Sequence, residues 1–370
     1  MSILFEPMKI GNLEIKNRFV RSATYFALAD DDGFIGQPSV DLMRTLAEGG
    51  VGLIVTGYAY IMKSGQCFID QNGIHSDDHI AGYKKMTKAV HDVGGKIVMQ
   101  IVHGGAGART VSEMGGDYMA VSINDKMPNW GKKAREMTDE DIESIINAFG
   151  HAARRVQEAG FDGVQIHGAH GYLVSQFLSP IGNRRNDKWG GSLENRMRFA
   201  VEITRAMKKE VGPDFPLMIK LGCRDYFEAP NVLTIQEGAE VAGKLEQAGI
   251  DFIEISHGYV DQAHRKKFLG ITKPEKEAYL LDDAKVVREE TTGPLCLVGG
   301  MRSPVKIEEI ISAGLVDFVS ICRPLIREPG LINRWQHGDT RPAECISCGK
   351  CFNPDENEKI HIFCNQLKKK

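Results

Sequence analysis

Apolar residues recur along the chain in short runs, separated by longer stretches of helical periodicity. Eight of these runs are rich in β-branched residues and predict buried strands: residues 18–22, 53–57, 96–101, 161–166, 217–220, 252–256, 295–298 and 318–322. Four of the runs follow a small residue and a glycine, near residues 50, 160, 249 and 314. Glycine readily adopts the left-handed conformation that ends a helix, so each junction predicts a helix that leads directly into a strand.

Helical periodicity fills the intervals, most clearly after Thr138, which is placed to cap a helix running toward Gln157. Strands that alternate with helices eight times predict an α/β chain folded as a (β/α)8 TIM barrel. An open doubly wound sheet is the alternative, but its fingerprint G-x-G-x-x-G is missing, and residues 104–107 have the wrong spacing. The glycine-rich segment 103–137 is longer than a barrel loop requires and is a candidate lid.

Length and composition fit one barrel with an appendage. Of the 370 residues, 42% are hydrophobic, which is enough for one large core. We expect residues 1–340 to form the barrel and residues 341–370 to form a C-terminal cysteine-rich extension. The net charge of -3 does not indicate a nucleic-acid partner. With neither a secretory signal pattern nor an apolar run of 18 residues, we expect a cytoplasmic protein without membrane contact. We also expect a homo-oligomer.

Two histidines and a tyrosine follow the fourth strand run. His167 and His170 are three residues apart, and Tyr172 comes two residues later. Barrel enzymes carry their catalytic side chains where strands open into loops at the C-terminal face. An isolated histidine is more often structural, and Tyr172 alone could be a packing aromatic. The spaced pair of imidazoles beside a phenol instead favours a catalytic site.

Four blocks of sequence resemble the old yellow enzyme family of FMN-dependent NADH:flavin oxidoreductases. They are residues 4–20, which begin Leu-Phe-Glu-Pro, and residues 100–105, 170–180 and 183–192. The resemblance covers residues 1–340. It implies an FMN across the C-terminal mouth of the barrel, NADH or NADPH as the reductant, and a small electron-poor alkene as the oxidant.

The same resemblance implies roles for individual residues. His167 and His170 would bind the carbonyl oxygen of the substrate, and Tyr172 would donate a proton to the alkene carbon opposite the hydride. Gln100 would contact the pyrimidine edge of the flavin, and Lys220 would contact N1 and O2. The remaining cofactor-binding candidates are Ala23, Tyr25, Gly57 and Cys322 near the flavin, and Gly299, Gly300 and Arg323 at its phosphate.

This chain departs from the family pattern at two of these positions. Lys220 stands where many members have arginine, a better bidentate donor, although lysine keeps the positive charge. Tyr25 stands where members often have cysteine or threonine, and where trimethylamine dehydrogenase has the cysteine that binds FMN covalently. We therefore expect a flavin that is not covalently attached at Tyr25 and whose potential is shifted.

Four cysteines close to the C-terminus form a separate candidate site. Cys345, Cys348, Cys351 and Cys364 have the spacing C-x2-C-x2-C-x12-C, which lets one chain enclose a metal or a cluster. The spacing leaves a [4Fe-4S] cluster, zinc and free thiols open. It resembles the iron-sulfur tails of trimethylamine dehydrogenase and 2,4-dienoyl-CoA reductase, and a cluster implies a redox partner protein.

The leading hypothesis is an FMN-dependent ene-reductase that passes hydride from NAD(P)H to an activated C=C bond of an α,β-unsaturated carbonyl compound. The alternative is an electron-transfer dehydrogenase that oxidises a small amine or a similar donor and uses FMN and a [4Fe-4S] cluster. A non-enzymatic scaffold that stores flavin or metal is disfavoured by the intact set of His167, His170 and Tyr172.

Overall fold

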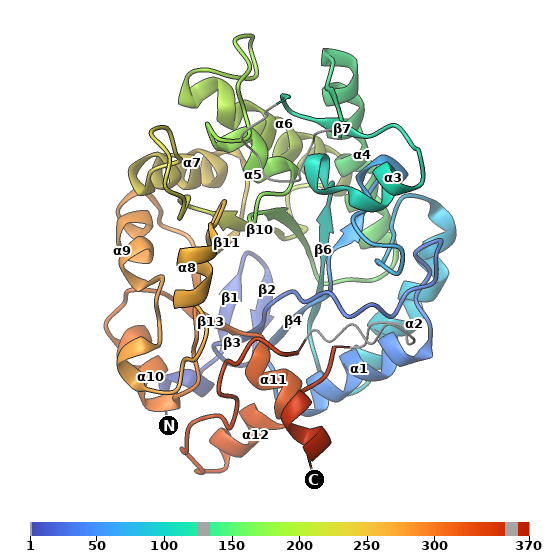
Figure 1. The fold of residues 1–370 in the computed structure, drawn as a ribbon. Coiled ribbons are helices and arrows are strands. Elements are labelled where there is room, and N and C mark those ends of the chain that lie inside the picture. Colours follow the sequence, from blue (N-terminus) through green and yellow to red (C-terminus); the bar gives the residue numbers. More distant parts are fainter. Residues whose placement is uncertain (1, 124–133, 352–361, 370) are drawn as a thin grey trace.

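The computed structural model describes residues 2–123, 134–351 and 362–369. Eight parallel strands form a closed barrel, because β4 pairs with β6 on one side and with β3 on the other. This arrangement confirms the predicted (β/α)8 barrel (Figure 1). The barrel strands are β3 (Phe19–Arg21), β4 (Leu53–Val55), β6 (Ile97–Val102), β9 (Val164–Gly168), β10 (Leu217–Gly222), β11 (Phe252–Ser256), β12 (Leu295–Val298) and β13 (Phe318–Ile321).

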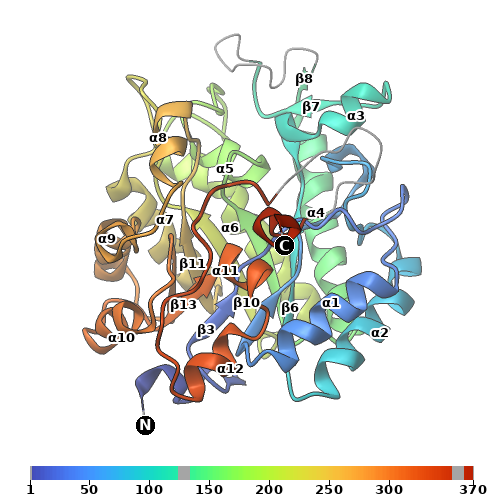
Figure 2. The same cartoon turned by 60° about the horizontal axis from the view of Figure 1, so that its bottom comes forward.

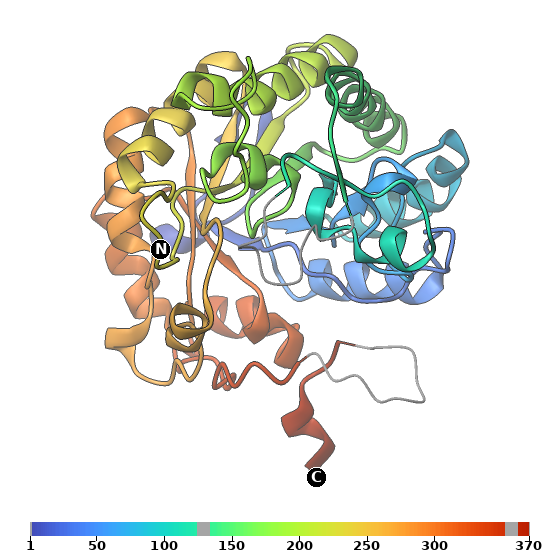
Figure 3. The same cartoon turned by 45° about the horizontal axis from the view of Figure 1, so that its top comes forward.

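Helices surround the barrel as an outer ring (Figure 3). They are α1 (Gln37–Glu48), α2 (Ile80–His91), α4 (Asp139–Glu158), α6 (Leu193–Val211), α7 (Ile235–Ala248), α9 (Leu281–Glu290), α10 (Pro304–Ser312) and α12 (Leu331–Gln336). Helix α4 begins where the sequence predicts. The Thr138 side chain accepts a hydrogen bond from the backbone N–H of Asp141, and the Asp141 carboxylate accepts one from the backbone N–H of Thr138. This reciprocal cap fixes the start of the helix.

The glycines predicted to end helices do adopt left-handed backbone. The φ angles are 94° at Gly50, 82° at Gly160, 115° at Gly249 and 68° at Gly314. Each turn sends the chain from a helix into the next barrel strand, β4, β9, β11 or β13. A residue with a Cβ would be strained there, so the glycines set the repeating unit of the fold.

An antiparallel hairpin, β1 (Met8–Ile10) and β2 (Leu13–Ile15), closes the N-terminal end of the barrel. Its buried side chains Ile10, Leu13 and Ile15 form one apolar cluster with residues near the start of seven of the eight barrel strands, including Phe252 and Phe318. Because apolar side chains fill that end, the interior is a packed core there, and any cavity must lie at the opposite end.

Loops after the strands carry the shorter elements to the C-terminal end of the barrel (Figure 2). These are β5 (Ala59–Tyr60), α3 (Arg109–Glu113), β7 (Met119–Ala120), β8 (Arg135–Glu136), α5 (Leu173–Leu178), α8 (Gln262–Lys267) and α11 (Arg323–Arg327). The candidate lid, residues 103–137, contains α3, β7 and β8, and residues 124–133 of it lie outside the described part.

After α12 the chain leaves the ring of helices and carries a 3-10 turn, Asn365–Lys369, away from the barrel (Figure 3). Residues 352–361 of the expected extension 341–370 lie outside the described residues. No helix in the described ranges is both long enough and apolar enough to cross a membrane.

Substituting Gly238 tests how closely α7 packs on the barrel. A Cβ at Gly238 would lie 1.8 Å from the backbone oxygen of Cys223, directly after β10, and that backbone has no flexible end to move away. We expect Gly238→Ala to lower the free energy of unfolding by about 1–3 kcal/mol or more, as overpacking does. Gly330→Ala is the matched control, because a Cβ there meets no atom within 4 Å. Urea unfolding of both variants measures the difference, and equal midpoints would contradict this packing.

Candidate active site

The end of β9 and the loop after it bring His167, His170 and Tyr172 together. The centroid of the His167 ring lies 5.1 Å from that of His170, nearly perpendicular to it, and 5.0 Å from that of Tyr172. His170 has φ of 60°, an unusual backbone conformation for a histidine, and its N–H donates to the carbonyl oxygen of His257 at 3.0 Å. Such strain is typical of functional sites, and here it turns the imidazole back toward His167.

Burial keeps these imidazoles neutral. It lowers the pKa of His167 to about 3, with the nearby Lys220 cation as the next contribution. The pKa of His170 is also held well below its usual range by burial and by the neighbouring His257. His170 Nε2 lies 2.8 Å from Ser256 Oγ, whereas His167 Nδ1 is buried with no hydrogen-bond partner among the described residues. A neutral imidazole can still donate one N–H to an oxygen of a ligand.

Tyr172 is held as a protonated phenol. Its hydroxyl lies 3.1 Å from that of Tyr58, and burial raises the pKa of Tyr172 above its ordinary value. Tyr58 was not among the residues predicted from the sequence, although it stands directly after Gly57 at the end of a predicted strand. A phenol that stays protonated beside neutral imidazoles is a potential proton donor.

A buried ion pair forms the floor of the site. Lys220 Nζ donates to Glu254 Oε1 at 2.9 Å and to Ser22 Oγ at 2.6 Å, and both charged side chains are almost completely buried. Glu254 Oε1 also accepts from the hydroxyls of Ser22 and Ser320, each at 2.7 Å. Burial opposes the carboxylate, but the Lys220 cation and these donors hold the pKa of Glu254 below its usual value. Lys220 is therefore a fixed positive charge at the barrel mouth.

Two amides extend the floor of the site toward β6. Gln165 Nε2 donates to Glu254 Oε2 at 3.1 Å, and Gln100 Nε2 donates to Gln165 Oε1 at 2.7 Å. This chain of hydrogen bonds orients the Gln100 amide from behind, so its position is set by the ion pair.

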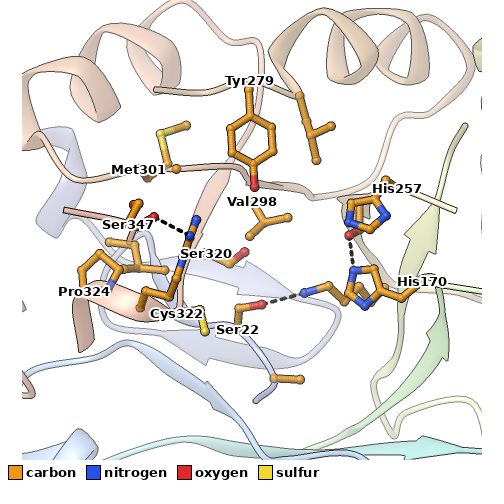
Figure 4. Close-up of a pocket in the computed structure, with 17 residues that line it drawn as sticks. Ser22, His170, His257, Tyr279, Val298, Met301, Ser320, Cys322, Pro324 and Ser347 are labelled. Atoms are coloured by element: carbon orange, nitrogen blue, oxygen red, sulfur yellow. Dashed lines mark hydrogen bonds between the residues drawn. The ribbon is translucent and has the colours of Figure 1, made fainter. Parts of the chain in front are cut away.

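A cavity with two lobes opens above this floor. The catalytic lobe has a volume of about 360 Å³, and the residues that line it include His167, His170, Tyr172, Gln100 and Lys220. The second lobe, of about 190 Å³, extends toward β12, β13 and α11. Figure 4 shows His170 and His257 at one end of the second lobe, and Cys322, Pro324 and Ser347 at the other. Ala23, His170, Lys220 and His257 line both lobes, which makes the cavity continuous.

The far end of the second lobe has the features of an anion site. Gly299 and Gly300 have φ angles of 146° and 70°, and a Cβ at Gly300 would lie 3.2 Å from atoms of Ile271 and Tyr279. Arg323 lines the same lobe, where its guanidinium donates to the carbonyl oxygens of Ser347 at 3.4 Å and Phe268 at 3.2 Å. Glycine backbone beside an arginine is a common cradle for phosphate.

The structure brings most, but not all, of the predicted residues to this cavity. Ala23, Gly300, Cys322 and Arg323 line the second lobe, and Gly299 precedes Gly300. Tyr25 and Gly57 instead line a small neighbouring hollow between β4 and α1. The Tyr25 ring stacks on Phe68 at 4.8 Å and its hydroxyl donates to Asp70, while its ring centroid lies 6.0 Å from that of Tyr58 in the wall of the catalytic lobe.

Several residues that line the cavity were not predicted from the sequence. His257 lies directly after β11 and its ring centroid is 4.6 Å from that of His170. His257 and Ser256 both stand at the end of a predicted strand, and that position could have marked them as candidates for the site. Arg265 on α8 and Tyr279 before α9 also line the cavity, but they belong to the connections after β11, whose path no local pattern predicts.

The four cysteines of the extension lie near one another without forming a closed metal site. Cys345 is buried, and Cys348, Cys351 and Cys364 are half-buried. Burial, together with the nearby thiols, raises the pKa of Cys351 to about 12. In the described ranges, no three His, Cys, Asp or Glu side chains are grouped so that they could hold a metal ion.

Comparisons with known proteins agree with this architecture. The NADH:flavin oxidoreductase / NADH oxidase family matches residues 3–341. The chain is 36% identical over 365 residues to the NADH oxidase of Thermoanaerobacter brockii, covering 98% of this chain and 55% of that protein. It is 37% identical over 332 residues to the NADPH dehydrogenase of Geobacillus sp. (strain WCH70), covering 89% of this chain and 92% of the relative.

Among solved structures, a 2-naphthoyl-CoA reductase in complex with 2-naphthoyl-CoA superimposes with a TM-score of 0.85 at 32% identity. The match covers 94% of this chain and 54% of that one. The chain thus spans about half the length of the NADH oxidase and of the 2-naphthoyl-CoA reductase, but most of the length of the NADPH dehydrogenase.

Separating the Lys220–Glu254 pair tests the floor of the site. Glu254→Gln or Lys220→Met alone leaves a buried charge without its partner, so we expect each to lower the free energy of unfolding by about 3–5 kcal/mol. The double variant should lose much less than the sum, because neither charge remains. Urea unfolding of all four proteins gives the coupling energy. Glu48→Gln, in the exposed Arg44–Glu48 pair, is the control and should have no measurable effect. Strict additivity would refute the coupling.

Proposed function

The chain belongs to the NADH:flavin oxidoreductase / NADH oxidase family, and on this premise we propose that it is an FMN-dependent ene-reductase acting on α,β-unsaturated carbonyl compounds. When bound, FMN would supply the hydride acceptor and donor between NAD(P)H and the C=C bond. The observation that carries the proposal is the neutral pair His167 and His170 beside the protonated Tyr172, all lining one cavity.

The residues at the cavity fit FMN. The second lobe ends at Gly300 and Arg323, a cradle that suits its phosphate, and Gln100 and Lys220 in the catalytic lobe suit the polar edge of its ring. Lys220 offers a cation for N1 and O2, where reduced flavin is negative. We assign Ala23 and Cys322 to the wall along the cofactor. Tyr25 and Gly57 border the site from the adjoining hollow, so their contribution would be support from behind.

The two imidazoles are suited to binding the carbonyl oxygen of the substrate. Negative charge grows on that oxygen as hydride reaches the β carbon, and preorganised N–H donors stabilise it. Because burial holds His167 and His170 neutral, neither has to change its protonation state to donate to the substrate. Tyr172 would give its proton to the α carbon, and its hydroxyl contact with Tyr58 keeps it oriented while it waits.

The charges of the cavity argue against the alternative of an amine dehydrogenase. The charged side chains that line the catalytic lobe are Lys220 and Arg265, with no carboxylate among the lining residues that the structure describes. Glu254 compensates the charge of Lys220, so a protonated amine would be repelled by Arg265, whereas a neutral carbonyl compound would not. We therefore favour the ene-reductase.

For the cysteine extension we propose a [4Fe-4S] cluster held by Cys345, Cys348, Cys351 and Cys364. The set consists of four thiols and no imidazole, with the close sequence spacing that such clusters use. Zinc is the alternative that the same four sulfurs could hold. A bound cluster would exchange single electrons, and this would require a redox partner protein. We further propose that residues 1–340 and 341–370 are separate functional units, and that the protein is a cytoplasmic homo-oligomer.

Replacing Tyr172 tests the proton donor. We expect Tyr172→Phe to slow alkene reduction by about 10²–10⁴-fold, since a positioned general acid contributes about that much. The anaerobic rate at which NAD(P)H bleaches the flavin should change little, because that step needs no proton from Tyr172. Stopped-flow absorbance measures both half-reactions. Tyr83→Phe is the control: Tyr83 lies in α2, its buried hydroxyl donates to the backbone oxygen of Gly73, and it lines neither lobe of the cavity. Equal loss in both half-reactions would argue against a role in proton donation.

Metal analysis of protein purified without oxygen tests the cluster. We expect iron and acid-labile sulfide in equal amounts and a broad absorbance near about 400 nm beneath the flavin bands. Cys348→Ser should abolish both signals, whereas Cys296→Ser, in β12 of the barrel, should retain them. Zinc without sulfide would contradict the cluster and indicate a structural metal, and absence of both iron and zinc would contradict it and indicate free thiols.

A further inference from the structure

Arg265 places a positive charge in the wall of the catalytic lobe. It lies on α8 and lines the same lobe as His167, His170 and Tyr172. Among the described residues, the structure records no hydrogen bond or ion pair for its guanidinium. Lys220, the other cation of this lobe, is paired with Glu254 and is the residue that we propose for the flavin edge. Arg265 is therefore the charge in this wall that is available to a ligand.

The short helix that carries Arg265 is fixed in place. The Asp261 carboxylate caps α8 by accepting from the His264 backbone N–H at 2.8 Å, and it also pairs with the His264 ring at 2.9 Å. At the other end of the helix, the Phe268 ring stacks on His257 at 5.5 Å and on Tyr279 at 4.5 Å. Because both ends of α8 are held, the backbone of Arg265 has a defined position, from which its solvent-exposed side chain lines the lobe.

None of the described residues that line the lobe carries a negative charge to balance Arg265. The described residues that line it include three histidines but no aspartate or glutamate. Burial keeps those histidines neutral, and the Arg265 charge acts in the same direction on His170 and His257. A concave wall with unbalanced positive charge attracts an anion.

We propose that Arg265 binds a carboxylate of the substrate, so that the preferred acceptors are alkenes that carry a carboxylate in addition to the carbonyl group that activates them. This inference rests on the proposed ene-reductase function. The shared lobe places the anion on the same small molecule as the reacting bond. The phosphates of NAD(P)H are a second source of negative charge, but a ribose separates them from the nicotinamide ring, which has to reach the flavin.

A pair of acceptors that differ in charge tests the proposal. Trans-4-oxo-2-pentenoate and its methyl ester share the same activated alkene, but only the acid is anionic at pH 7. The variants are Arg265→Met, which removes the charge at similar length, and Arg265→Lys, which keeps it. Lys267→Met is the matched control, because Lys267 ends the same helix, is exposed and does not line the lobe.

The measured quantity is the ratio of kcat/KM for the acid to that for the ester, which cancels effects on the flavin and on folding. We expect Arg265→Met to lower this ratio about tenfold or more, as loss of a charge-assisted hydrogen bond does. Arg265→Lys should restore much of it, and Lys267→Met should leave it near the wild-type value. An unchanged ratio in Arg265→Met would overturn the proposal. So would an unchanged ratio combined with a raised KM for NADH or NADPH, which would assign Arg265 to the nucleotide.

Calorimetric titration of the oxidised protein with the acid and the ester separates this inference from the proposed function. If neither compound is reduced but Arg265→Met still loses affinity for the acid alone, the anion site stands and the ene-reductase activity fails. If the wild-type protein binds the acid no more tightly than the ester, the anion site itself is refuted.

Discussion

The buried ion pair of Lys220 and Glu254 is the constraint on which the active site depends. Two charges removed from water are tolerated only when each is fully compensated. The strand register supplies the compensation: Lys220 on β10 is the direct partner of Glu254 on β11 and, on its other side, of His167 on β9. Placing the cation therefore also places the imidazole. Ser22, after β3, and Ser320, on β13, satisfy the same carboxylate, so the pair ties together strands from around the barrel.

Burial also sets the protonation states on which the chemistry relies. The same loss of water that lowers the pKa of His167 and His170 raises the pKa of Tyr172. At neutral pH the lobe thus offers neutral N–H donors and a protonated phenol at once, and no carboxylate is among the described residues that line it. Lys220 strengthens this pattern, because its positive charge further opposes protonation of the imidazoles. A site of this kind stabilises developing negative charge and delivers a proton, which are the two demands of reducing an activated alkene.

The sequence predicted the parts of the fold that are encoded locally. Apolar runs marked all eight barrel strands, and glycines such as Gly160 marked the turns between helix and strand. His167, His170 and Tyr172 were found because they follow one strand closely. Glu254 was not predicted to belong to the site. A charged residue inside an apolar run is unusual, but its partner Lys220 lies on another strand, so the pair could not be recognised from either segment alone. Arg265 gave no signal, because its approach to the lobe depends on the path of the loop after β11.

The C-terminal segment forms part of the wall of the site. Ser347, between two of the cysteines, has φ of 53°, and its carbonyl oxygen accepts from the Gly270 N–H at 2.9 Å and from Arg323. Arg323 in turn donates to the carbonyl oxygen of Phe268, the residue directly after α8. One short network therefore joins the cysteine segment, the glycine and arginine end of the cavity, and the helix that carries Arg265. A group held by the cysteines would bear on the cofactor end of the cavity through these contacts. Ordering of the cysteine segment would in the same way help to fix the loop that sets the charge of the substrate lobe.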